Sequence, residues 1–128
     1  MDDMPWDAAT YDADRELTGY VWHNYFHLLS PFEFTVWKAV AWQQKGAPSN
    51  GNVARVLRKR FEEARSDPQV AAAIDDYDLF RQQARDRILA EHADKVTINR
   101  CSRCQRIVAT PQARQCLWCG LDWHNPKT

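Results

Sequence analysis

Four cysteines near the C-terminal end constrain the fold of this chain more than any other feature of its sequence. They are the only cysteines among 128 residues, and they form two Cys-x-x-Cys pairs, Cys101/Cys104 and Cys116/Cys119, with eleven residues between the pairs. Two such pairs offer four thiolates to one tetrahedral metal ion. The commonest pattern has a longer separator of roughly 15–20 residues, so the spacing predicts a compact metal-binding module.

The residues between and beside the pairs predict a small β ribbon around the metal. Ile107 and Val108 are β-branched, and Pro111 is typical of a turn before the chain returns to the second pair. Residues 96–98 and 121–123 are candidate strands on either side. We therefore expect a zinc ribbon.

The residue after each pair is expected to need a left-handed backbone, so that N–H groups turn toward the sulfurs. Gly120 meets this need without steric cost. Gln105 holds the equivalent place after the first pair, where a left-handed side-chain residue costs about 1–2 kcal/mol. Each Cys-x-x-Cys pair with the residue after it forms a knuckle, residues 101–105 and residues 116–120. The two knuckles are therefore expected to differ in backbone geometry. Four arginines lie close to the ligands in sequence and are expected to offset the negative charge of four thiolates: Arg100, Arg103, Arg106 and Arg114.

Four cysteines have other known uses besides a structural zinc site. The chain starts with an acidic segment that lacks the apolar run of a signal peptide, so we expect a cytoplasmic location in which thiols stay reduced rather than forming disulfides. A redox Cys-x-x-Cys motif normally stands alone at the start of a helix. Iron in a rubredoxin-like site uses the same four ligands and remains an alternative. Four cysteine ligands close the coordination sphere, which favours a structural over a catalytic metal.

The charge of the chain is zero in total but uneven along its length. Residues 1–30 carry six acidic side chains and one basic, whereas residues 95–128 carry six basic side chains and one acidic. A basic module favours contact with nucleic-acid phosphates. The zero net charge and a sequence pI near 6.9 argue against this use and favour solvated or mutually paired surfaces.

Helical periodicity dominates the chain before the cysteines. The clearest boundary is Ser30-Pro31-Phe32-Glu33, a capping box with proline at the first helical position, and Gly46 is a matching stop. Five helices are expected, over residues 12–29, 31–45, 53–65, 68–74 and 79–92. In the third, we expect Val53, Val56, Leu57, Phe61 and Ala64 to face inward.

These observations predict a mainly α protein with a small β zinc ribbon, of the α+β class. We expect a helical domain of four to five helices in residues 1–94, which begins with an irregular arm, and a zinc-ribbon-like module in residues 95–128. No stretch approaches the 18 or so apolar residues of a membrane-spanning helix.

Other candidate site residues have ordinary structural explanations. His23 and His27 are four residues apart, but no third ligand and no HExxH motif accompany them. His124 follows a complete set of four cysteine ligands, so we expect that it does not bind the metal. Trp118 lies between two ligands and is either an exposed partner contact or a residue that packs the module onto the helices.

The sequence offers no motif for catalysis. It contains no glycine-rich phosphate loop, no GxSxG motif and no cysteine outside the two pairs. We therefore expect a protein that is not an enzyme.

Residues 99–124 resemble the C-terminal cysteine module of a group of small uncharacterised bacterial proteins. The usual form of that module is a CPxCG knuckle, a threonine-proline turn, and a QCxWCG knuckle with an aspartate-tryptophan-histidine tail. The matching segments are Thr110-Pro111, Gln115 to Gly120, and Asp122-Trp123-His124. Ser102 and Gln105 depart from the proline and glycine of the first knuckle. The resemblance implies a bacterial origin and bound zinc, and it implies no activity.

The resulting hypothesis is a cytoplasmic, non-enzymatic protein that binds another protein, as an adaptor, an inhibitor or an immunity-type protein. Its single zinc ion is structural and is held by Cys101, Cys104, Cys116 and Cys119. The alternative is an accessory protein that binds nucleic acid through the basic module and the third helix. No membrane partner is expected.

Overall fold

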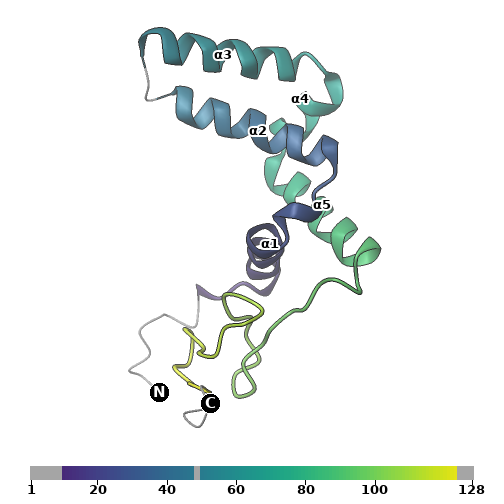
Figure 1. Ribbon diagram of the computed structural model, residues 1–128, viewed down its shortest axis with the longest axis vertical. Coiled ribbons are helices and arrows are strands. Elements are labelled where there is room, and N and C mark those ends of the chain that lie inside the picture. Colours follow the sequence, from purple (N-terminus) through teal and green to yellow (C-terminus); the bar gives the residue numbers. More distant parts are fainter. Residues whose placement is uncertain (1–9, 48–49, 124–128) are drawn as a thin grey trace. The chain divides into compact units, whose positions relative to one another are not determined.

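The computed structural model describes residues 10–47 and 50–123. These residues form five α-helices, one short 3-10 helix and no β-strand (Figure 1). The elements are α1 (Ala13–Asn24), η2 (Phe26–Leu28), α2 (Pro31–Gly46), α3 (Gly51–Arg65), α4 (Pro68–Asp75) and α5 (Tyr77–Glu91). The prediction of a mainly helical protein is confirmed. In place of the expected strands, the described C-terminal residues form two isolated antiparallel bridges, Arg100 with Ile107 and Gln115 with Asp122.

Side-chain caps begin three of the helices. The Ser30 hydroxyl accepts a hydrogen bond from the Glu33 N–H at 3.1 Å, and the Glu33 carboxylate accepts one from the Ser30 N–H at 2.9 Å. This is the predicted capping box of α2. Asp12 caps α1 by accepting from the Arg15 N–H, and Asp67 caps α4 in the same manner.

The first helix is shorter than predicted, because α1 ends at Asn24 rather than near Leu29. The Asn24 side-chain amide donates to the carbonyl of Tyr20 and to that of Ala109, which lies 85 residues further along the chain. Tyr25 leaves helical geometry with φ −126° and ψ 30°. Tertiary hydrogen bonds therefore accompany the end of this helix at a point where the apolar periodicity continues.

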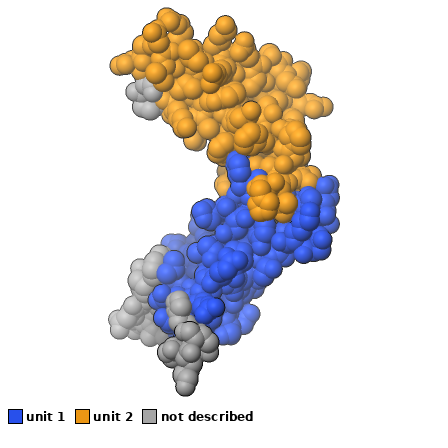
Figure 2. All heavy atoms as spheres, viewed as in Figure 1, with its two compact units in different colours: residues 1–26, 88–128 blue, residues 27–87 orange. Residues whose placement is uncertain are grey.

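The chain divides into two compact units, which Figure 2 colours separately. Unit 1 comprises residues 1–26 and 88–128, and unit 2 comprises residues 27–87. The division falls within η2 and within α5. The predicted boundary between residues 94 and 95 stays a prediction.

Unit 2 is built on the antiparallel pair of α2 and α3, with α4 in contact with both (Figure 1). A Cβ atom placed on Gly46 would lie 3.4 Å from the Cβ of Leu57, an ordinary van der Waals separation, so the end of α2 packs directly on α3. The buried apolar side chains of the unit are Val36, Ala39, Val40, Ala54, Val70, Phe80 and Ala84. Two inward predictions are wrong, because Val53 and Val56 are 60% and 45% exposed. Ala54, one residue further round the helix than Val53, is buried instead.

A partly buried ion pair fastens the start of α2 to α5 within the same unit, with Glu33 buried and Arg87 25% exposed. The Arg87 guanidinium donates to both carboxylate oxygens of Glu33, at 2.6 and 2.8 Å, and to the Leu28 carbonyl at 2.8 Å. Burial alone would raise the pKa of Glu33, but the hydrogen bonds and charge of Arg87 and the hydrogen bonds from Ser30 outweigh it and lower that pKa. Glu33 is therefore ionised, and it serves the helix cap and the ion pair together.

Unit 1 joins α1 to the C-terminal segment through buried tyrosines. The Tyr20 hydroxyl donates to the Thr97 carbonyl and accepts from the Asn99 N–H at 3.2 Å. The Tyr25 hydroxyl accepts from the Thr97 N–H at 2.9 Å. Burial raises the pKa of Tyr20, so its hydroxyl keeps the proton that it donates.

None of the helices in the described ranges is long and apolar enough to cross a membrane.

Candidate metal centre

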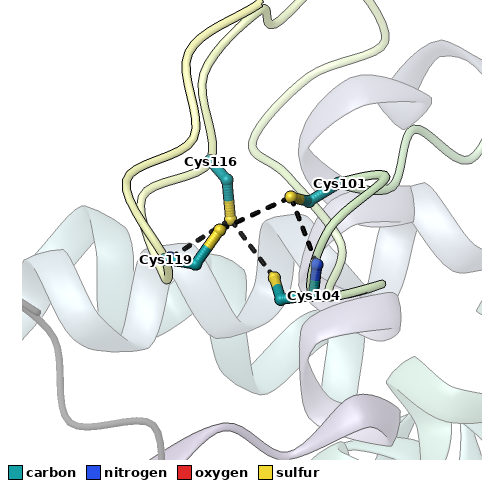
Figure 3. A group of neighbouring side chains, drawn as sticks. All are labelled: Cys101, Cys104, Cys116 and Cys119. Carbon is teal, nitrogen blue, oxygen red and sulfur yellow. Dashed lines mark hydrogen bonds between the residues drawn. The ribbon is translucent and has the colours of Figure 1, made fainter. Parts of the chain in front are cut away.

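The four cysteine side chains converge on one point in unit 1, as Figure 3 shows. Their Sγ atoms all lie within 4.8 Å of one another, with Cys101 and Cys119 at 3.5 Å and Cys104 and Cys116 at 3.6 Å. Cys101 and Cys116 are buried, and the other two are partly exposed. The cysteines are thus positioned to hold a metal ion.

The two knuckles have the same backbone hydrogen bonds. In the first, the N–H groups of Arg103 and Cys104 donate to the Cys101 sulfur at 3.3 and 3.5 Å, and the Gln105 N–H donates to the Cys101 carbonyl. In the second, Trp118, Cys119 and Gly120 make the corresponding bonds to Cys116. Residues fifteen positions apart thus have equivalent roles in the two knuckles.

The left-handed residues follow the same equivalence. Gly120 has φ 83°, as predicted, and Gln105 has φ 65°. The expectation that the knuckles differ is therefore wrong for the backbone. The Gln105 side-chain amide donates to the Ser102 carbonyl at 3.0 Å, which offsets part of the cost of a left-handed side-chain residue.

The sulfur geometry fits a tetrahedral ion. With metal–sulfur bonds of about 2.3 Å, a tetrahedral site has sulfur–sulfur separations of roughly 3.8 Å, close to the observed 3.5 and 3.6 Å. A disulfide requires about 2.05 Å, and all four cysteines are free thiols. Backbone N–H groups also donate to the sulfurs of Cys101 and Cys116, where they would stabilise the negative charge of metal-bound sulfur.

The environment of the sulfurs is not uniform. Burial raises the pKa of the Cys116 thiol to about 12, although backbone N–H groups partly oppose this. Burial also acts to raise the pKa of Cys119, but hydrogen bonds from the Leu121 backbone and from neighbouring side chains, Arg103 included, lower it to about 6. Metal binding must therefore displace the proton of the Cys116 thiol, whereas the lowered pKa of Cys119 favours its thiolate.

Two of the four predicted arginines have direct partners around the knuckles. Arg103 donates to the Cys119 carbonyl at 2.7 Å, which ties the first knuckle to the second. Arg100 donates to the Gln105 carbonyl at 3.2 Å. The guanidinium groups thus lie beside the backbone that carries the sulfurs, where their charge opposes that of the thiolates.

Side chains outside the cysteine motif hold the segment in place. The Asn99 amide donates to the carbonyls of Thr110, Pro111 and Ala113, and so closes the connection between the knuckles. The Tyr11 hydroxyl accepts from the Ile107 N–H at 3.0 Å across 96 residues of sequence. Sequence reasoning missed Asn99 and Tyr11, because contacts at such separations leave no local pattern.

Trp118 packs within unit 1. Its ring meets that of Tyr11 edge to face, with centroids 5.0 Å apart, and Arg106 lies 5.4 Å from the Tyr11 ring. Of the two predicted roles, this contact matches packing against the rest of the chain. The order from Trp118 through Tyr11 to Arg106 links the tip of one knuckle to the base of the other.

The remaining predicted candidates do not join the cluster. His23 and His27 are exposed, and α1 ends between them, so they do not share one helical face. His124 lies outside the described residues. Within the described ranges, the four cysteines form the one group of metal-binding side chains with three or more ligand atoms close together.

Comparisons with known proteins do not extend this description. No protein-family model, no curated protein and no solved structure matches the chain. The resemblance of residues 99–124 to a bacterial cysteine module therefore rests on the motif residues alone.

Proposed function

We propose that the four cysteines bind one Zn²⁺ ion and that this zinc is structural. The carrying observation is the convergence of four Sγ atoms at near-tetrahedral separations, two of them buried. A site closed by four cysteines leaves no coordination position for water or substrate, so it supports a fold rather than a reaction. On this proposal, the two antiparallel bridges beside the knuckles are the start of a zinc ribbon, and the protein is not an enzyme.

The proposed function is protein interaction, with the zinc module as part of the scaffold. The protein would act as an adaptor, an inhibitor or an immunity-type protein in the cytoplasm. Nucleic-acid binding through the basic module is the alternative. The placement of Arg103 on the Cys119 carbonyl and of Arg106 over the Tyr11 ring favours the first role, because these cations already serve the module itself.

Elemental analysis of the purified full chain tests the metal proposal. We expect one zinc per chain in the wild type and less than one tenth of this in Cys116→Ser, which removes a buried ligand. Leu117→Ser is a matched control, because it places serine on an exposed neighbour in the same knuckle and should keep the metal. Unchanged zinc in Cys116→Ser would refute the site. A coloured protein that contains iron would show that the bound metal is iron rather than zinc.

Titration with a labelled oligonucleotide at low salt separates the two interaction roles. Phosphate contacts lose affinity steeply with added salt, so the alternative requires binding at about 50 mM salt that weakens at 200 mM. The proposed protein-interaction role requires no such binding.

A further inference from the structure

One face of the α2–α3 pair combines aromatic rings, cations and exposed aliphatic side chains. On α2, Phe34, Lys38 and Trp42 follow one another at four-residue steps, which places them on one side of the helix. The Lys38 ammonium lies 4.9 Å from the Phe34 ring centroid and 5.8 Å from that of Trp42. The Arg60 guanidinium of α3 lies 6.0 Å from the Trp42 ring. Cation–π contacts therefore hold both charges at defined places.

The same face continues along α3 with exposed valines. Val53, Val56 and Arg60 are spaced by three and four residues, so they share one side of α3. Val53 is 60% exposed, Val56 45%, and Phe34 37%. We call these six residues the α2–α3 face: Phe34, Lys38, Trp42, Val53, Val56 and Arg60. Burial of its apolar atoms by a partner would contribute about 25 cal/mol per Å².

The charge around the α2–α3 face indicates an acidic partner. Residues 31–65 carry seven Lys or Arg side chains and three Asp or Glu, a balance of plus four. Glu33 is already paired with Arg87 and Arg65 with Asp75, which leaves six cations against Glu62 and Glu63 in this segment. A partner with carboxylates would therefore complement the face and associate faster at low salt.

The dimensions of the α2–α3 face suit a helix. Arg60 lies beside Trp42 and the two helices run antiparallel (Figure 1), so the step from Arg60 to Val53 along α3 runs in the same direction as the step from Phe34 to Trp42 along α2. At 1.5 Å per residue, this path is about 22 Å long, which is covered by a helix of about 15 residues. Apolar side chains at three- and four-residue steps would lie on the valines and on Phe34.

We propose that the α2–α3 face binds an acidic amphipathic helix of a partner protein; this inference rests on the proposed protein-interaction function. Aromatic and arginine side chains are the residues that most often dominate the energy of protein interfaces. Single-stranded nucleic acid is a poorer match, because Lys38 and Arg60 lie over the rings on which bases would stack, and the exposed valines gain nothing from phosphates.

Selection of random 16-residue peptides displayed on phage, against the zinc-loaded full chain, tests the proposal. We expect the selected peptides to be rich in Asp and Glu, with Leu, Phe or Ile at helical spacing. Their affinity should fall about tenfold with Lys38→Glu and about fivefold with Val56→Asn. Arg58→Glu makes the same charge change at an exposed position two residues from Val56, on the opposite side of α3, and should leave affinity within twofold. Circular dichroism and zinc content of each variant establish that the fold is retained.

Three results would overturn the inference. Selected peptides that lack acidic residues, or an absence of binding peptides, would contradict an acidic helix as the occupant. Acidic peptides that bind the Lys38→Glu and Val56→Asn variants with the same affinity as the wild type would place protein interaction on another surface. The proposed function would then still stand. Labelled (dT)₂₀ whose binding is lost in Lys38→Glu would assign the face to nucleic acid and refute the protein-interaction role as well.

Discussion

The residue after the second knuckle offers a sharp test of how the metal centre is built. Gly120 has φ 83°, and a Cβ atom added there would meet nothing within 4 Å. Gly120→Ala therefore introduces no clash, and its cost is that of holding alanine in the left-handed region, about 1–2 kcal/mol. Because this geometry aims the backbone at the sulfurs and metal binding is coupled to folding, the cost should appear as weaker zinc binding by about five- to thirtyfold.

Competition with a chromophoric zinc chelator measures this change on the full chain. Gly19→Ala is a matched control, because Gly19 also has nothing within 4 Å of an added Cβ but lies in the middle of α1. Alanine there should leave zinc affinity unchanged and stabilise the helix by up to about 1 kcal/mol. Equal or tighter zinc binding by Gly120→Ala would refute the left-handed knuckle and the equivalence with Gln105 that follows from it.

Further predictions concern the partly buried ion pair and the response to acid. Arg87→Met leaves the Glu33 carboxylate buried without its cation and should lower the free energy of unfolding, measured in urea, by about 3 kcal/mol. The control Arg58→Met, on an exposed part of α3, should change this free energy by less than about 0.5 kcal/mol. Equal effects of the two variants would contradict a stabilising pair. The pKa of Glu33 is lowered from an ordinary value of 4.5, so its stabilising contribution is complete above that pH and is lost as the pH falls through the lowered pKa. The free energy of unfolding of Glu33→Gln should therefore fall less steeply with acidification than that of the wild type. An equal fall in both proteins would count against this role of Glu33. Acidification should also release zinc, with proton uptake by the cysteines, and an ion-sensitive dye that detects no release by about pH 4 would argue against thiolate ligands.

The features that sequence analysis predicted correctly are those encoded within a few residues. Ser30, Pro31 and Glu33 form a complete cap by themselves, and Gly120 follows its knuckle directly. The face of α3 was predicted only in part, because Leu57 belongs to two overlapping apolar stripes, one with Val53 and Val56 and one with Ala54 and Phe61. Packing against α2 decides between the stripes, and that choice is not a local property.

The end of α1 and the residues that support the cysteines were not predictable for a related reason. Asn24, Tyr20 and Tyr11 act through hydrogen bonds that cross 77 to 96 residues of sequence. Each is a polar group on an otherwise ordinary amphipathic or irregular segment, and periodicity carries no information about its partner. The equivalence of the two knuckles was missed because Gln105 takes a conformation that the sequence rule reserves for glycine.

The cysteine cluster and the tyrosines together explain how a segment without strands keeps one structure. Residues 92–123 contain no helix and only isolated bridges among the described residues, so their backbone groups depend on side chains for partners. The sulfurs of Cys101 and Cys116 accept hydrogen bonds from backbone N–H groups of the knuckles. The hydroxyls of Tyr20 and Tyr25 hydrogen-bond to the backbone of Thr97, and that of Tyr11 accepts from the Ile107 N–H. The cysteine cluster fixes the two knuckles to each other, and the tyrosines fix them to α1. If the cysteines bind the proposed metal, its loss would therefore free the knuckles first, and the tyrosine contacts would determine how far the loss spreads into α1.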